Sequence, residues 1–413
     1  MTSMVFVVPV GLSRPTGGNR YDQELTRALS DLGTSVEVRE VAGDWPEADG
    51  PARAALAAAL RSEAPVLADG LLACGAPQQV ADAVAAGGRV HVLVHMPLAL
   101  DIGLTPQVAA RRDALERASL RAATSVLTIS AWTAAELRRR HGLARVAVAR
   151  PGAGPAPLAH GSDPPRLLHL AAVTPVKDQL GVVTTLAQLR DLPWTAWLSG
   201  DDRAAPGYAA TVREAIRTHR LNDRVLLTGP LTGDELHAAF AATDLLLLPS
   251  RAETWGLAVT EALARGIPAV VSAGTGAVEA LTGGEPCDPR ELPGAVVPPG
   301  DRCALAAALR AQLGADRVRA RTAARARRSP LPSWQDTART VLEAVPEAVL
   351  GGGRISPAPQ QYRAAIPARP VDPDWLALRE DADARARALG STDLLRQLVQ
   401  HLRDERPSRG DGR

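Results

Sequence analysis

The chain has 413 residues, of which 46% are hydrophobic and 22% charged, so it is long enough for two or three domains with large cores. The formal net charge is only +2 and aromatic residues make up 3%, which argues against a nucleic-acid partner, because such proteins carry a clustered basic face with stacking aromatics. No apolar run reaches the roughly 18 residues of a membrane-spanning helix.

The N-terminal part alternates strand-like apolar runs with helical patterns. Residues 5–10 predict a strand, residues 11–19 a loop, and residues 21–32 an amphipathic helix. Gly17 and Gly18 in the loop allow a close backbone approach that a side chain would forbid. The loop is not a G-x-G-x-x-G sequence, which counts against a dinucleotide-dependent dehydrogenase.

Two later strands of this half end in polar residues. Residues 91–94 lead to His95, which therefore stands where α/β folds place functional groups. Residues 123–129 lead to Ser130, which we expect to cap the following helix rather than to act in catalysis. Residues 150–165 are rich in Pro, Gly and Ala and predict a linker to a second half.

The second half contains the one lysine of the chain. All but one of the 47 basic residues are arginine, and the exception is Lys177. It follows the apolar run 167–173 and precedes a helix that starts near Gln179, so it lies in a loop at the carboxyl end of a predicted strand. A lysine offers a compact point charge that arginine does not. A single lysine in a chain that otherwise uses arginine therefore indicates a specific role.

Residues 245–276 predict a β-α-β unit that carries two carboxylates. Residues 245–248 are a strand-length apolar run, residues 256–265 have helical spacing, and residues 269–271 form a second run. Glu253 lies in the loop before the helix and Glu261 lies inside it, eight positions later.

Ligands of such units sit outside the carboxyl ends of the strands, where the free N–H groups of the helix start bind phosphate. We therefore expect Glu253, Glu261 and the amides near Gly256 and Leu257 to converge on one anionic ligand rich in hydroxyls. A nucleotide sugar fits this description.

This segment resembles the E-x7-E segment of retaining glycosyltransferases with the GT-B fold, in the large family 4 group. The matching residues are Glu253, Trp255, Gly256, Glu261, Ala262, Ala264, Gly266, Pro268 and Val270. The resemblance implies an α/β fold of two Rossmann-like domains that face each other across a cleft. It also implies that Glu253 contacts the donor hexose, that Glu261 holds the ribose hydroxyls, and that the backbone at Gly256 and Leu257 meets the diphosphate.

Three other loops resemble loops of the same family. The resemblance implies that Gly17 and Gly18 lie near the donor diphosphate and the acceptor, and that His95 lies near the donor hexose. Lys177 resembles the lysine of a G-R-x-x-x-x-K-G loop that neutralises the diphosphate. We accordingly predict catalytic roles for Lys177, Glu253 and His95. The residues predicted to bind the donor are Gly17, Gly18, Gly256, Leu257 and Glu261.

The lysine loop departs from the family pattern. Ala171 and Ala172 occupy the Gly and Arg places, and Asp178 replaces the Gly after the lysine. One of two phosphate cations is therefore missing, and fixed charge at the leaving group is usually a large catalytic term. Arg203 and Arg251 are both candidates for its replacement.

The resemblance covers about residues 4–345, and composition and periodicity beyond it complete a division of the chain into five parts. These are an N-terminal domain on the acceptor side, a hinge, a C-terminal domain on the donor side, a Pro/Gly-rich linker, and a helical extension of unknown role: residues 1–150, 151–165, 166–345, 346–373 and 374–413.

The predicted function is transfer of a hexose from a nucleotide diphosphate sugar to an unknown acceptor, with retention of the anomeric configuration. A non-catalytic nucleotide-sugar binding protein and a sugar-nucleotide epimerase of the same fold are alternatives. No cofactor and no metal is expected, and the pair Asp201 and Asp202 is interpreted as a solvated turn. The oligomeric state is left open.

Two further features bear on location. The arginine-rich residues 317–328 are interpreted as a charged helix face in preference to a lipid-binding patch, with peripheral membrane contact left open. Cys74, Cys287 and Cys303 are far apart and lack metal-ligand spacing, which favours structural thiols in a cytoplasmic protein.

Overall fold

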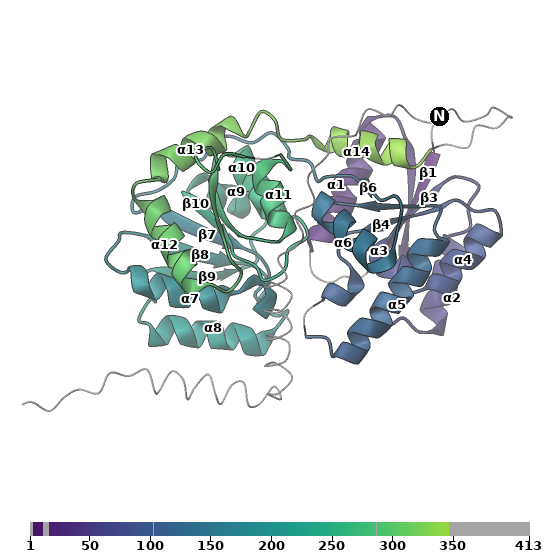
Figure 1. The fold of residues 1–413 in the computed structure, drawn as a ribbon, viewed down its shortest axis with the longest axis horizontal. Helices are drawn as coiled ribbons and strands as arrows, with labels where there is room; N and C mark the ends of the chain where they lie inside the picture. Colours follow the sequence, from purple (N-terminus) through teal and green to yellow (C-terminus); the bar gives the residue numbers. More distant parts are fainter. Residues whose placement is uncertain (1–2, 11–15, 102, 286, 347–413) are drawn as a thin grey trace, which may run out of the picture. The chain divides into compact units, whose positions relative to one another are not determined.

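The computed structural model describes residues 3–10, 16–101, 103–285 and 287–346, all within one compact unit, residues 1–350. It contains two six-stranded parallel sheets, in the orders β2-β1-β3-β4-β5-β6 and β12-β11-β10-β7-β8-β9 (Figure 1). The predicted extension at residues 374–413, and the linker before it from residue 347, lie outside the described residues.

The first half of the chain alternates strands and helices. Its elements are β1 (Ser3–Pro9), α1 (Gly17–Asp31), β2 (Ser35–Val41), α2 (Gly50–Ala59), β3 (Val66–Asp69), α3 (Gly70–Ala73), α4 (Pro77–Ala85), β4 (Val90–Val94), η1 (Leu98–Leu100), α5 (Pro106–Ala122), β5 (Ser125–Thr128), α6 (Ala131–His141) and β6 (Ala147–Val148).

The second half repeats the alternation. Its elements are β7 (Arg166–Leu170), η2 (Pro175–Lys177), α7 (Gln179–Leu186), η3 (Ala187–Leu189), β8 (Thr195–Ser199), α8 (Pro206–Thr218), β9 (Val225–Gly229), α9 (Gly233–Ala241), β10 (Leu245–Leu248), α10 (Leu257–Ala264), β11 (Ala269–Ser272), α11 (Gly276–Thr282), β12 (Gly294–Val297), α12 (Arg302–Leu313), α13 (Arg317–Ala326) and α14 (Trp334–Ala344).

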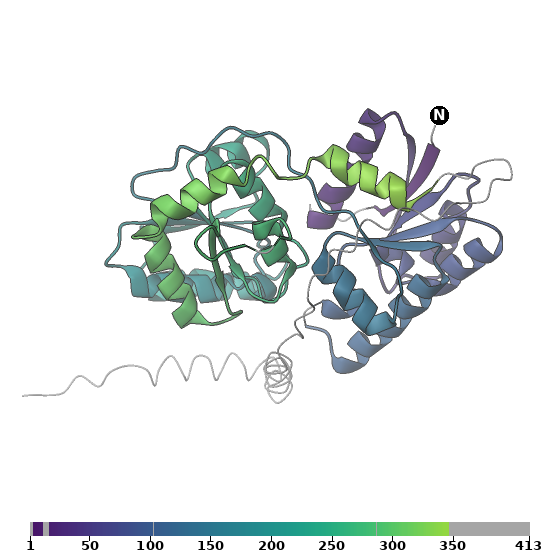
Figure 2. The same ribbon diagram turned by 45° about the horizontal axis from the view of Figure 1, so that its top comes forward.

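Strand β10 shows why the strands read as continuous apolar runs. Leu245 and Leu247 pack into a core with residues of α7, α8 and α12, whereas Leu246 and Leu248 pack into a second core with residues of α10 and α11. A parallel strand that is covered by helices on both faces has no solvent-exposed face, so its side chains on both faces are apolar. Figure 2 shows these helices on the two faces of the sheet.

Helix α14 packs against α1, in the other half of the chain. Its capping box, formed by Ser333 and Asp336, sets its start, and the rings of Trp334 and Tyr21 meet edge to face with centroids 5.4 Å apart. The domain division predicted from the sequence places the residues of α14 in the second domain, residues 166–345. The spacing of the apolar residues in α14 identifies the buried face of the helix, but it does not specify which element that face packs against.

Helix α1 starts earlier than the sequence predicted. The side chain of Thr16 accepts a hydrogen bond of 3.2 Å from Asn19 N, so that Gly17 and Gly18 form the first helical turn and not a loop. The N-cap bond satisfies an otherwise unpaired helix donor, which offsets the low helix propensity of the two glycines.

The linker is held against the start of α14 by close backbone contacts. Ala153 N donates to Pro332 O at 2.8 Å, and Thr337 Oγ1 donates to Arg150 O at 2.6 Å. A Cβ atom placed on Gly152 would lie 2.2 Å from Trp334 N, so a side chain there must separate the two segments.

We expect Gly152→Ala to lower the free energy of unfolding by about 1–3 kcal/mol, the usual cost of overpacking. The matched control is Gly154→Ala, because a Cβ there meets no heavy atom within 4 Å. Thermal unfolding of the two variants measures the difference. Equal melting temperatures would contradict this packing of the linker.

Candidate functional site

His95 lies partly buried between two buried carboxylates at the carboxyl end of the first sheet. It directly follows β4, and its Nε2 lies 2.9 Å from Asp22 Oδ1 and 3.4 Å from Asp69 Oδ2. Asp69 ends the neighbouring strand β3, and Asp22 comes from α1. The ring of Tyr21 meets the imidazole edge to face at 5.1 Å.

This environment holds a proton on His95. Burial alone would lower its pKa, but the charge of Asp22 and hydrogen bonds to Asp22 and Asp69 raise the pKa to about 10. Burial also raises the pKa of Asp22, to about 7, but the larger upward shift on the imidazole favours His95 as the proton carrier, with its Nε2–H donating toward the carboxylates. The ligand atoms of these three residues also lie within 4.8 Å of one another, a spacing at which a metal ion could displace this proton.

Lys177 and Glu253 form an ion pair at the carboxyl end of the second sheet. Lys177 ends the short helix η2, and its Nζ lies 2.5 Å from Glu253 Oε2. The two loops are also joined by their backbones, since Arg251 N donates to Val176 O at 2.7 Å. Asp178 has a φ of 55°, a left-handed conformation that explains why glycine suits this position in the family pattern.

The start of α10 is built around Gly256. This residue has a φ of 91°, and a Cβ on it would lie 2.8 Å from Leu248 Cδ2, so both backbone and space favour glycine. The preceding Trp255 is buried and its Nε1 donates to Thr260 Oγ1 at 2.8 Å. These contacts fix the direction of the first amides of α10, which is 8 residues long.

The start of α1 lies beside the start of α10. A Cβ on Gly17 would be 3.8 Å from Leu257 Cδ1, and a Cβ on Gly18 would be 3.3 Å from His95 Cδ2. Loops predicted separately from the two halves of the chain are thus neighbours. Glycine at these positions leaves the two helix starts close together.

Glu261 points toward the first half of the chain and is paired there. Its Oε1 lies 2.5 Å from Arg20 Nη1, with the glutamate side chain 15% exposed and the arginine 46% exposed. Burial raises the pKa of Glu261, while the charge of Arg20 acts to lower it. The sequence analysis missed Arg20, although its position two residues after the Gly-Gly pair placed it near the same site.

The two candidates for the missing cation are both engaged by aspartates. Arg203 Nε lies 3.1 Å from Asp201 Oδ1, and Arg251 Nη2 lies 3.4 Å from Asp178 Oδ1. Asp201 is only 9% exposed, so the solvated turn predicted for it is wrong. Its backbone oxygen also accepts from Val173 N, which draws this residue against the loop after β7.

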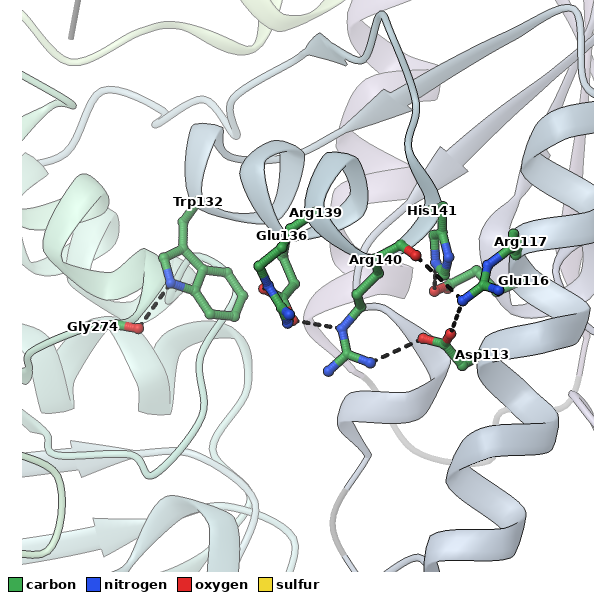
Figure 3. A network of polar contacts seen from close by, with 9 residues as sticks. All are labelled: Asp113, Glu116, Arg117, Trp132, Glu136, Arg139, Arg140, His141 and Gly274. Atoms are coloured by element: carbon green, nitrogen blue, oxygen red, sulfur yellow. Dashed lines mark hydrogen bonds and ion pairs between the residues drawn. The ribbon is translucent and has the colours of Figure 1, made fainter. Parts of the chain in front are cut away.

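A second acidic cluster supports the segment after His95. Glu116 of α5 is fully buried, accepts from Leu98 N at 3.0 Å, and pairs with His141 Nε2 at 2.7 Å. Figure 3 shows this pair next to Asp113, whose carboxylate binds Arg117 and Arg140. The carboxylates of Asp113 and Glu116 thus contact two arginines, the imidazole of His141 and one backbone amide, and these contacts join α5 to α6.

Direct bonds also link α6 to α11. Trp132 Nε1 donates to Gly274 O at 2.8 Å (Figure 3). The backbone N of the same tryptophan donates to Glu279 Oε2 at 3.1 Å, and Glu279 Oε1 accepts from Arg150 Nε at 2.7 Å. This carboxylate thus joins the start of α6 and the start of the linker to the second sheet's helices.

Arginines of the basic helix α13 and just beyond it bind the chain itself. Arg321 donates to Asp244 and to Ala159 O, and Arg328 donates to Ala156 O at 2.7 Å. Their guanidinium groups fasten the linker to the second half of the chain. Among the described residues, every helix is too short or too polar to cross a membrane.

Two parallel sheets of Rossmann-like topology, with a last helix that returns to the first sheet, define a protein of the GT-B class. The fold predicted from the sequence is confirmed. Sucrose-phosphate synthase from Thermosynechococcus elongatus shares it, with a TM-score of 0.68, 20% identity, and coverage of 83% of this chain and 98% of that one. Anabaena Alr3699/HepE in complex with UDP and glucose has a TM-score of 0.65 and 18% identity, and covers 83% and 99%.

Part of the chain is similar in sequence to glycosyltransferases. Residues 155–329 match the family model for glycosyl transferases group 1. A D-inositol 3-phosphate glycosyltransferase of Kineococcus radiotolerans is 31% identical over 197 residues, which are 46% of this chain and 45% of the relative. The chain therefore spans less than half the length of that curated relative. The similarity of residues 155–329 to glycosyl transferases group 1 agrees with the glycosyltransferase resemblance found in the sequence.

We expect Asp22→Asn to lower the pKa of His95 by more than about one unit, because it removes the nearer opposite charge. Titration of ring-labelled histidines by NMR measures the shift, and loss of the resonance in His95→Gln identifies it. Asp31→Asn, at the exposed end of the same helix, is the control. A His95 pKa near its ordinary 6.5 in the unaltered protein would contradict the geometry.

The same raised pKa has a consequence for stability. The folded protein holds the His95 proton more tightly than the unfolded chain, so the contribution of His95 itself is complete below pH 6.5 and is lost as the pH rises through about 10. Burial raises the pKa of its partner Asp22 from 3.8 to about 7, so the contribution of Asp22 falls earlier, as the pH rises through about 7.

Proposed function

We propose that the protein transfers a hexose from a nucleoside diphosphate sugar to an acceptor, with retention of the anomeric configuration. The observation that carries the proposal is the Lys177–Glu253 pair, 2.5 Å apart, next to the first amides of α10. One ammonium group and a helix start provide positive potential for a diphosphate, and the carboxylate provides an acceptor for sugar hydroxyls.

The departing nucleoside diphosphate gains negative charge as the glycosidic bond breaks. Lys177 stabilises that charge, and it can do so without reorganisation because its loop is bonded to the Arg251 loop. His95, as an imidazolium, donates to a hydroxyl or to the transferring group. On this proposal a phosphate oxygen of the donor takes the acceptor proton, and neither an enzymic nucleophile nor a metal is required.

A structural neighbour is in keeping with this donor class, and a sequence relative is in keeping with the reaction class. The Anabaena structure of the same fold holds UDP and glucose, and the Kineococcus protein is a D-inositol 3-phosphate glycosyltransferase. Hexose, base and acceptor are outside this proposal, because they depend on loop shape. We also propose a cytoplasmic location, in keeping with the free thiols of Cys74, Cys287 and Cys303.

The second candidate function is non-catalytic binding of a nucleotide sugar. It is favoured by Ala172, which leaves the lysine loop with one cation. A binding protein would show a donor-dependent rise in melting temperature without release of nucleoside diphosphate.

A panel of UDP, GDP and ADP sugars, tested by thermal shift and by release of nucleoside diphosphate, separates the two functions. With the donor that binds, we expect Lys177→Ala to lower turnover about 100-fold or more, because it removes a leaving-group cation. We expect Glu261→Ala to weaken nucleotide binding about tenfold.

Glu235→Ala, at an exposed position of α9, is the control and should change neither quantity. Unchanged donor affinity and unchanged turnover in both site variants would refute the assignment of these residues. Failure of every nucleotide sugar to bind would refute the function itself.

A further inference from the structure

Among the described residues of the first half, Arg20 is the basic side chain that pairs with a predicted donor-binding carboxylate, Glu261. It lies near the start of α1, four residues after the capping Thr16. Gly17, which follows Thr16, approaches Leu257 of α10. The guanidinium therefore reaches across from one helix start to the flank of the other.

The Arg20–Glu261 pair is poorly suited to a purely stabilising role. Its nitrogen–oxygen distance is 2.5 Å, but the arginine side chain is 46% exposed, and exposed pairs contribute little to stability. Glu261 is four residues beyond Leu257, which is about 6 Å along the helix axis at the rise of an α-helix. A long arginine side chain can cover that distance by rotamer changes without movement of α1.

We propose that Arg20 leaves Glu261 when a donor binds and pairs with the donor diphosphate, and so supplies the cation that Ala172 lacks. This inference rests on the proposed function. Ribose hydroxyls would take the place of the guanidinium on the carboxylate of Glu261. The guanidinium would then meet a diphosphate, whose greater charge and oxygen geometry suit its bidentate donors better than a single carboxylate does.

The other arginines near the lysine loop are less suitable for this role. Arg251 faces Asp178 and Arg203 faces Asp201, so each already meets a carboxylate that the donor is not expected to occupy. Of these three arginines, Arg20 is the one that is paired with a carboxylate that the donor itself is expected to engage. Its release is thereby coupled to donor binding.

The test compares the affinities of Arg20→Met for a nucleoside diphosphate and for the matching nucleoside. The probes are UDP and uridine, GDP and guanosine, and ADP and adenosine, with dissociation constants from calorimetry or from NMR titration at millimolar concentration. We expect about a tenfold or greater loss for the diphosphate that binds, because a charge-assisted hydrogen bond is lost. Affinity for the nucleoside should stay unchanged or increase, because Glu261 is no longer occupied.

Two further variants complete the design. Arg27→Met, in the same helix with its partner Glu24, should leave both affinities unchanged. Ala172→Arg, at a partly exposed position, should restore diphosphate affinity when added to Arg20→Met. Arg20→Lys keeps the charge and should lose less diphosphate affinity than Arg20→Met. This comparison distinguishes loss of the charge from misfolding of the variant.

An equal loss of affinity for nucleoside and diphosphate would show that Arg20 only positions Glu261, and would overturn the inference. No loss for the diphosphate would also overturn it. If the unaltered protein binds none of the three diphosphates, the proposed function fails and the inference fails with it. If it binds one and Arg20→Met binds that one equally well, only the inference fails.

Discussion

The common direction of the strands within each sheet is the constraint on which the candidate site depends. Because neighbouring strands are parallel, their carboxyl ends meet at one edge, and the residues that follow them gather there. Asp69 and His95 follow adjacent strands of the first sheet, and the loops after β7 and β10 bring Lys177 to Glu253 in the second. An antiparallel strand in either place would send one partner to the opposite edge.

Charge neutralisation is the second physical theme of the site. Each predicted donor-binding carboxylate has a cation within 2.5 Å, and the imidazolium of His95 has two carboxylates. Pairs of this kind keep partly buried charges stable without a ligand, and they also place acceptors and cations where a sugar and a diphosphate would need them. A ligand with both kinds of group can exchange partners with the pairs at a modest electrostatic cost.

Sequence reasoning succeeded where chemistry follows from local order. Lys177 just before a helix, Glu253 before α10 and Ser130 as an N-cap were each placed by strand and helix signals within a few residues. It failed at Gly17 and Gly18, where one side-chain bond from Thr16 extends the helix against glycine propensity. It also failed at Asp201, which is buried because its neighbours pack against the loop after β7.

The sequence by itself determined the alternation of strands and helices, the identity of the loops at the strand ends, and the glycosyltransferase resemblance of residues 155–329. These properties depend on patterns of period two or 3.6 and on short motifs, which are local. Only the tertiary structure decided that α14 returns to α1, that Asp22 and Asp69 enclose His95, and that Arg20 meets Glu261. Each of these is a contact between residues far apart along the chain, and no local pattern specifies which distant side chain will complete a charge pair.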